Sequence, residues 1–223
     1  ASKASGYPIA RVTAKIAVGM ALEDISIANT NAAFDPQLDY VIAKLPRFPF
    51  DKFATAPNTL GTQMKATGEI MSIGSNLEEC FLKAVRSLEI GADHYCLAKF
   101  DKMSEAELLD YLKEYRDDNI YAVAELFRRG ESIEKIHDIT KITPYFLEAY
   151  KNIVDMEAKI KSNVGNLDIL KEAKKLGFCD KVIAKYWGMT EIEVFNIRKE
   201  NDWSGSGRHD RMSMCTGIRE RIR

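Results

Sequence analysis

The 223-residue sequence has little of what marks membrane proteins and nucleic-acid binders. It has no run of about 18 apolar residues, which excludes a membrane-spanning helix by length. It also has almost no net charge, because 32 lysines and arginines face 33 aspartates and glutamates. Since a dedicated nucleic-acid-binding domain is normally basic, we expect neither a membrane nor a nucleic acid among the partners.

Cysteine and histidine are scarce as well. The chain has four cysteines and three histidines: Cys80, Cys96, Cys179, Cys215, His94, His137 and His209. No two cysteines form a CxxC pair, and no histidine lies beside one at the spacing of zinc ligands. We therefore expect no metal site, and reduced thiols in a cytoplasmic protein.

The common catalytic motifs are missing too, among them the GxxxxGK[ST] and GxGxxG loops and the GxSxG elbow. Residues 61–65 combine a glycine, a hydroxyl and a lysine, but we interpret them as a strand that leaves a turn. A small enzyme that used Lys65 and Glu69 would need a phosphate-sized pocket lined by both. We interpret His137 as a packed or surface histidine rather than a catalytic base.

Two pairs of neighbouring carboxylates, Glu78-Glu79 and Asp117-Asp118, could in principle serve general acid-base chemistry. Neighbours in a helix point about 100° apart, so the two members of a pair do not share one face. We therefore interpret both pairs as solvated helix faces.

The chain divides near Gly74. Residues 1–74 hold five of the six prolines. Their pattern predicts a helix over 8–19, a short strand over 40–43 and a second strand over 62–73. Residues 44–49, which include two prolines, are expected to end the first strand. Gly68 within the second strand indicates a bulge or a close backbone approach. Two strands and a helix cannot close a core alone, so this is incomplete α/β material.

Residues 75–203 predict roughly eight helices and hence an all-α domain. Capping boxes are expected at Ser75–Glu78, Ser104–Glu107 and Thr190–Glu193, and Thr143-Pro144 opens the longest helix. The fold class is therefore mainly α. We interpret residues 204–223, with five arginines and two acids, as a flexible tail and a candidate non-native segment.

Two helical segments, 132–147 and 180–194, resemble each other. Aligning Thr143 with Thr190 also places Ile136 on Ile183 and Leu147 on Val194. The spacing in the second copy is that of a helix-turn-helix, so a DNA-binding protein with 190–200 as recognition helix is the alternative function. We favour simple helix packing, because the acids of that helix outnumber its bases and phosphates would repel it.

Specific strings carry a resemblance to a known family. They are ASKASGYPIARVTAKIAVG at 1–19, FDPQLDYVIAKLPRF at 34–48, LGTQMKATGEIMSIG at 60–74, EECFLKAVRSLE at 78–89 and LGFCDKVIA at 176–184. Over residues 1–202 the chain resembles the large subunit of carbamoyl phosphate synthetase. By this resemblance, residues 1–74 are the C-terminal part of the first ATP-grasp (carboxyphosphate) domain, and 75–203 are the helical oligomerisation domain.

The resemblance implies a parent ligase that makes carbamoyl phosphate from bicarbonate, ammonia and two ATP with Mg or Mn. A glutaminase small subunit would supply the ammonia from glutamine. The product serves both arginine and pyrimidine synthesis, so the pathway stays open. The family's Glu-x-Asn-x-Arg metal motif would lie before Ala1, so we expect this fragment to hold no catalytic residue, cofactor or metal and to be catalytically incomplete. Its role would be structural, in subunit association and domain bridging.

One residue has an implied functional neighbourhood. By the resemblance, Pro46 lies near the internal tunnel that carries ammonia and carbamate, although a role as strand terminator would explain it as well.

Self-association has support from composition. Nine aromatic residues fall within about 80 positions: Tyr111, Tyr115, Tyr121, Phe127, Tyr145, Phe146, Tyr150, Tyr186 and Trp187. A domain of this size cannot bury all its surface, so we expect some rings at the exterior, where tyrosine and tryptophan favour interfaces.

Overall fold

The computed structural model describes residues 2–50, 52, 53, 55 and 57–201, which form two compact units, 2–39 and 40–201. Helices make up most of the regular structure, so the predicted mainly α fold class is confirmed. The tail at 204–223, with His209 and Cys215, lies outside the described residues.

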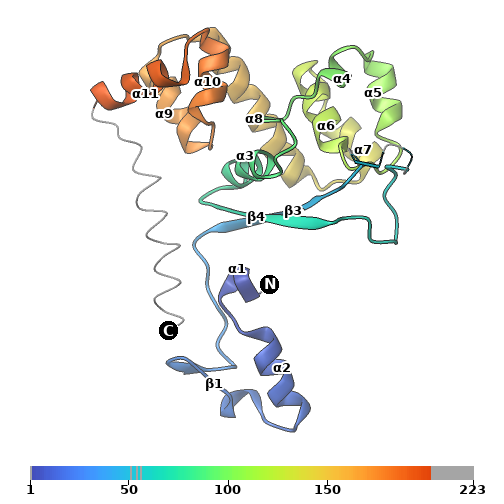
Figure 1. Cartoon of the computed structure of the whole chain (residues 1–223), viewed down its shortest axis with the longest axis vertical. Coiled ribbons are helices and arrows are strands. Elements are labelled where there is room, and N and C mark those ends of the chain that lie inside the picture. Colours follow the sequence, from blue (N-terminus) through green and yellow to red (C-terminus); the bar gives the residue numbers. More distant parts are fainter. Residues whose placement is uncertain (1, 51, 54, 56, 202–223) are drawn as a thin grey trace. The chain divides into compact units, whose positions relative to one another are not determined.

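The first unit combines short helices with a two-strand ribbon (Figure 1). Its elements are α1 Ser2–Ser5, α2 Ile9–Ala17, η1 Leu22–Asp24, β1 Ser26–Ile27 and β2 Thr30–Asn31. Val12, Ile25 and Ala32 form its core, and the Tyr7 hydroxyl donates to the Ala32 carbonyl at 2.6 Å. The helix predicted over 8–19 is present but ends two residues early, before Gly19 at a φ of +92°.

The second unit begins with an antiparallel ribbon of β3, Val41–Arg47, and β4, Gly68–Gly74. The prediction that residues 44–49 end the first strand, with Pro46 as its terminator, is wrong, because Pro46 pairs with Glu69 within the ladder. Both strands of a two-strand ribbon are edge strands, and a proline is tolerated there. The expectation for Gly68 is also wrong, since the register is unbroken and an added Cβ would meet nothing within 4 Å.

Between Leu77 and Glu200 the structure has nine helices, where roughly eight were predicted over 75–203. They are α3 Leu77–Ser87, α4 Ala98–Asp101, α5 Glu105–Tyr111, α6 Asn119–Arg128, α7 Ile133–Thr140, α8 Pro144–Ser162, α9 Leu167–Lys175, α10 Asp180–Trp187 and α11 Glu191–Glu200. The additional helix, α4, has four residues and no side-chain cap, so it left no signal in the sequence.

Side-chain caps explain where several helices begin. Ser104 and Thr190 form the predicted capping boxes with Glu107 and Glu193. The box at Ser75–Glu78 is wrong by one residue, because Asn76 is the N-cap and accepts from the Glu79 backbone N–H at 2.8 Å. The Glu79 carboxylate reaches back to the backbone N–H of Ser75 at 2.8 Å.

Within the second unit, α3 packs against both strands of the ribbon and against α8 (Figure 1). The long helix α8 also contacts α6, α7, α9 and α10, so it forms the centre of the helical unit. The domain boundary expected at Gly74 stays a prediction. It was placed where the composition of the sequence changes, whereas contacts in the structure group the β3–β4 ribbon with the helices.

The internal repeat predicted from the sequence corresponds to two matching helix pairs, α7–α8 and α10–α11. All four aligned apolar residues, Ile136, Ile183, Leu147 and Val194, are completely buried. The alignment also places Lys141 opposite Gly188. Both residues end their helix in the left-handed conformation, with φ of +58° and +66°.

This comparison predicts that Lys141→Gly stabilises the protein. A non-glycine residue in the left-handed region costs about 1 kcal/mol, and the second copy avoids this cost with glycine. We expect the free energy of unfolding in urea to rise by about 1 kcal/mol. Lys141→Ala is the control and should gain nothing, and equal stabilities for the glycine and alanine variants would contradict the prediction.

Candidate functional site

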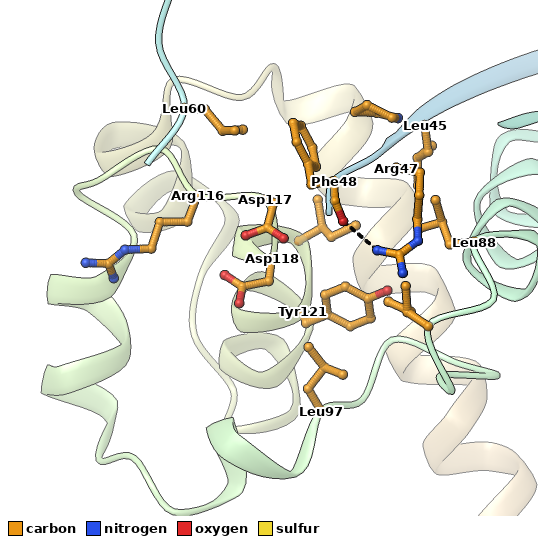
Figure 2. Close-up of a pocket in the computed structure, with 13 residues that line it drawn as sticks. Leu45, Arg47, Phe48, Leu60, Leu88, Leu97, Arg116, Asp117, Asp118 and Tyr121 are labelled. Carbon is orange, nitrogen blue, oxygen red and sulfur yellow. Dashed lines mark hydrogen bonds between the residues drawn. The ribbon is translucent and has the colours of Figure 1, made fainter. Parts of the chain in front are cut away.

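A cavity of about 380 Å³ lies in the second unit, beside the end of β3 and the first turn of α6 (Figure 2). Pro46, the residue that the resemblance places near a tunnel, is part of its wall. Most of the wall is apolar and comes from four separate parts of the chain: Leu45, Phe48, Leu60, Leu88, Leu97 and Ile120.

Two arginines line the same cavity but differ in direction. Arg47 points inward and donates from Nη1 to the Phe48 carbonyl at 2.5 Å (Figure 2). Arg116 points away, with its guanidinium carbon 4.1 Å from the centre of the Tyr111 ring and an ion pair to Glu114 at 2.7 Å. The only arginine that faces the cavity is therefore Arg47, among the residues that the structure describes.

Two aspartates stand at the start of α6, and they differ in their partners. Asp118 is buried, forms an ion pair with Lys99 and accepts from the Tyr111 hydroxyl at 2.9 Å. Asp117 is half-buried, and burial together with the charge of Asp118 raises the pKa of its carboxyl. Arg47 and Lys99 oppose this shift only in part.

Tyr121 contributes an unusual group to this wall. Its side chain is 3% exposed, and its hydroxyl has no hydrogen-bond partner among the described residues. Burial raises the pKa of this hydroxyl well above its ordinary value, so it stays protonated. The cavity thus combines apolar walls with one cation, one half-buried carboxyl group and one unsatisfied hydroxyl.

The structure does not bring Lys65 and Glu69 together. The Lys65 ammonium donates to the carbonyls of Pro57 at 3.2 Å and Thr59 at 2.5 Å, whereas Glu69 pairs with Lys44 at 2.6 Å. His137 contacts the carbonyl of Ile142 through Nδ1 at 2.7 Å, which fits a packed histidine. These contacts hold the backbone and suggest no catalytic arrangement.

The interpretation of the acidic pairs as solvated faces is wrong for one member of each pair. Glu79 is 1% exposed and forms an ion pair with Lys83 at 3.0 Å, and Asp118 is buried against Lys99. A carboxylate can be buried when a cation and hydrogen-bond donors meet it there. The helix periodicity alone did not show which cations would come close.

A buried polar cluster was missed by sequence reasoning altogether. Glu157 on α8 accepts from His94 Nε2 and from Arg128 Nε, both at 3.0 Å, and also pairs with Lys161. Burial alone would raise the pKa of Glu157, but these three partners hold it well below its usual value. His94 and Glu157 are 63 positions apart, so no local pattern could have joined them.

The α10–α11 pair bears on the DNA-binding alternative. Arg198, one of the two bases of α11, is 8% exposed and forms a buried ion pair with Asp180, which Lys174 also contacts at 2.9 Å. The acids Glu191, Glu193 and Glu200 are exposed. The outer surface of α11 is therefore more acidic than its sequence suggested, which disfavours contact with phosphates.

The resemblance implies ATP with Mg or Mn for the parent enzyme. Within the part of the chain that the structure describes, no three histidine, cysteine, aspartate or glutamate side chains gather as metal ligands do. The described thiols of Cys80, Cys96 and Cys179 are free. No helix among these residues is long and apolar enough to cross a membrane.

Comparison with known protein families agrees with the resemblance drawn from the sequence. The family model of the carbamoyl-phosphate synthetase large chain, oligomerisation domain, matches residues 69–202. The matched segment begins in β4 and extends just past α11. This match covers more than half of the chain. The chain therefore belongs to the carbamoyl-phosphate synthetase large-chain family, and its helical unit is that family's oligomerisation domain.

Proposed function

We propose that the helical unit is a self-association module of a carbamoyl-phosphate synthetase large chain and plays a structural role there. The observation that carries this proposal is a set of apolar side chains left exposed within the family match. Four of these side chains are Tyr145 (63% exposed), Phe146 (42%), Ile192 (71%) and Phe195 (48%).

The aromatic residues fall into a buried group and an exposed group, as expected of a module that has both a core and an outer contact surface. Tyr121, Phe127, Tyr150 and Trp187 are buried and belong to the core. Tyr115, Tyr145 and Phe146 are exposed, so the expectation that some rings lie at the exterior is confirmed for these three. Tyrosine and phenylalanine are enriched in protein interfaces, which supports a contact through the adjacent Tyr145 and Phe146.

The exposed residues form two pairs at related positions of the repeat. Tyr145 and Phe146 lie in the first turn of α8, with ring centres 5.5 Å apart. Ile192 and Phe195 lie three positions apart on α11 and so share one face. The repeat alignment matches Tyr145 with Ile192, so both helix pairs expose an apolar side chain at the same place. We propose that a two-fold contact uses these pairs.

For the whole enzyme, we infer the family's ATP-dependent synthesis of carbamoyl phosphate from bicarbonate and ammonia, with a glutaminase subunit as partner. We place residues 1–74 at the end of the first ATP-grasp domain. The place of Pro46 in a cavity wall supports the proposal that it lies near the internal tunnel.

Self-association is tested by sedimentation of the full chain over a hundredfold range of concentration. We expect reversible dimers, and we expect Tyr145→Ser with Phe146→Ser, or Ile192→Ser with Phe195→Ser, to weaken the dimer at least about tenfold, which corresponds to about 1.4 kcal/mol. The loss follows from removing buried apolar area at the contact.

Tyr115→Ser is the matched control, because Tyr115 is a similarly exposed aromatic residue outside both pairs. It should leave the dimer unchanged. A monomer at every concentration up to about 1 mM would overturn the proposal, and so would dimers that neither double variant weakens.

A further inference from the structure

The cavity beside β3 has the size and the walls of a site for a small, largely apolar molecule. Its volume of about 380 Å³ lies within the usual range of ligand pockets. Aliphatic side chains from separate parts of the chain line it, with Leu45 from β3, Leu97 from the residue before α4 and Ile120 from the start of α6. Apolar surface that a ligand buries against these side chains favours binding.

One polar group of the cavity wall has no partner, and it is the hydroxyl of Tyr121. This side chain is 3% exposed, and its hydroxyl forms no hydrogen bond with any described residue. Figure 2 shows its ring among the apolar side chains of the wall. Burial raises the pKa of the hydroxyl, so it keeps its proton at neutral pH and remains a donor. A buried donor without a partner costs free energy, which an acceptor atom of a ligand would recover.

The charged groups of the wall leave no clear place for a charged ligand. Arg47 is engaged by the Phe48 carbonyl at 2.5 Å and by a further interaction, so we assign it no ligand. Arg116 points away from the cavity (Figure 2), and the Asp118 carboxylate already pairs with a lysine. Asp117 is the remaining carboxyl group, and it is half-buried.

A ligand of either charge would therefore be disfavoured. An anion would be repelled by Asp117. A cation would be repelled by Arg47, which lies close enough to lower the pKa of the Asp117 carboxyl. Either charge would also lose its hydration against walls that are mostly apolar. The site therefore favours a neutral ligand whose polar part is one hydrogen-bond acceptor.

We propose that this cavity binds a small neutral carbonyl compound with an aliphatic body, of the ketone class. The carbonyl oxygen accepts from the Tyr121 hydroxyl, and the aliphatic body packs on Leu88, Leu97 and Ile120. A carbonyl fits better than an alcohol or an amide, because it brings no donor of its own that apolar walls would leave unpaired.

The test titrates the full chain with two probes of one shape, 5-methylhexan-2-one and 4-methylpentanoate. The second probe carries a charged oxygen where the ketone has a methyl group. Changes in the protein's NMR spectrum report binding, and contacts between the ketone's methyl groups and those of Leu97 and Ile120 locate the probe. We expect the ketone to bind at least about tenfold more tightly than the carboxylate.

Two variants separate the hydrogen bond from the charge. Tyr121→Phe should weaken the ketone about three- to tenfold, which is the usual effect of one neutral hydrogen bond. This variant should fold normally, because it removes only an unpaired hydroxyl. Asp117→Asn should leave the ketone unchanged and strengthen the binding of the carboxylate, because it removes a repelling charge.

Tyr115→Phe is the matched control, because it makes the same change at an exposed tyrosine outside the cavity wall. It should leave the affinity for the ketone unchanged. The proposal is overturned if the folded protein binds no ketone up to about 10 mM, if the carboxylate binds as tightly as the ketone, or if Tyr121→Phe keeps the full affinity.

Discussion

Gly177→Ala is expected to destabilise the protein by about 3 kcal/mol or more. Gly177 follows α9 with a φ of +95°, a region that L side chains rarely adopt. An added Cβ would also lie 2.7 Å from the Cα of Glu79, closer than real Cβ contacts occur. The obstacle is backbone rather than a flexible side chain, so α3 would have to move away from the end of α9.

The movement would break contacts that join α3 to this turn. Asn76 donates through Nδ2 to the Lys175 carbonyl at 3.1 Å, and Arg86 donates through Nη1 to the Gly177 carbonyl at 3.0 Å. Asn76 is also the N-cap of α3, so a displaced turn weakens the start of that helix.

Gly130 offers a control with nearly the same backbone and no obstacle. Its φ is +89°, and an added Cβ would meet nothing within 4 Å. Gly130→Ala should therefore cost only about 1 kcal/mol, the price of the left-handed conformation. Urea unfolding of both variants measures the difference, and equal losses would show that close packing of Gly177 on α3 contributes nothing.

The helices could be predicted because their signals are local. A cap such as Ser104 or Thr190 and a glycine such as Gly130 or Gly188 act on the nearest turn, so the sequence itself contains the interaction. The repeat was predictable for the same reason, since buried residues such as Ile136 and Ile183 recur at one spacing. The helix that was missed, α4, has no such cap.

The cavity and the buried cluster could not be predicted, because both depend on residues far apart in the chain. Arg47 comes from the ribbon and Tyr121 from α6, and only the packed structure brings them to one wall. Asp117, which lies just before α6, was interpreted as a solvated residue but is half-buried. Residues from distant parts of the chain surround it, and the periodicity of the sequence does not specify them. Pro46 alone was singled out, through the family resemblance rather than through its chemistry.

Glu157→Ala is expected to destabilise the protein by about 3–5 kcal/mol, because it removes one partner of a buried network. Glu157 is 3% exposed, and without its carboxylate both His94 and the Nε of Arg128 lose their acceptor. Arg128 also donates to the Tyr95 carbonyl at 2.5 Å, so the loss reaches the loop before α4. Glu148→Ala, an exposed glutamate of the same helix, should change little, and similar losses for both variants would contradict the prediction.

The same network should make stability depend on pH, with a sign that follows from His94. Burial lowers the pKa of His94 below its ordinary 6.5, although its hydrogen bond to Glu157 partly opposes the shift. Near pH 6 the His94 side chain therefore binds a proton more readily in the unfolded chain than in the folded one. The free energy of unfolding consequently falls as the pH drops below 6.5. Glu157, with its lowered pKa, adds a further loss below about pH 4.5. Urea unfolding from pH 7.5 to 5 should show this fall in the natural chain and a flatter curve in His94→Gln. Parallel curves would mean that His94 accepts its proton as readily in the folded protein as in the unfolded chain.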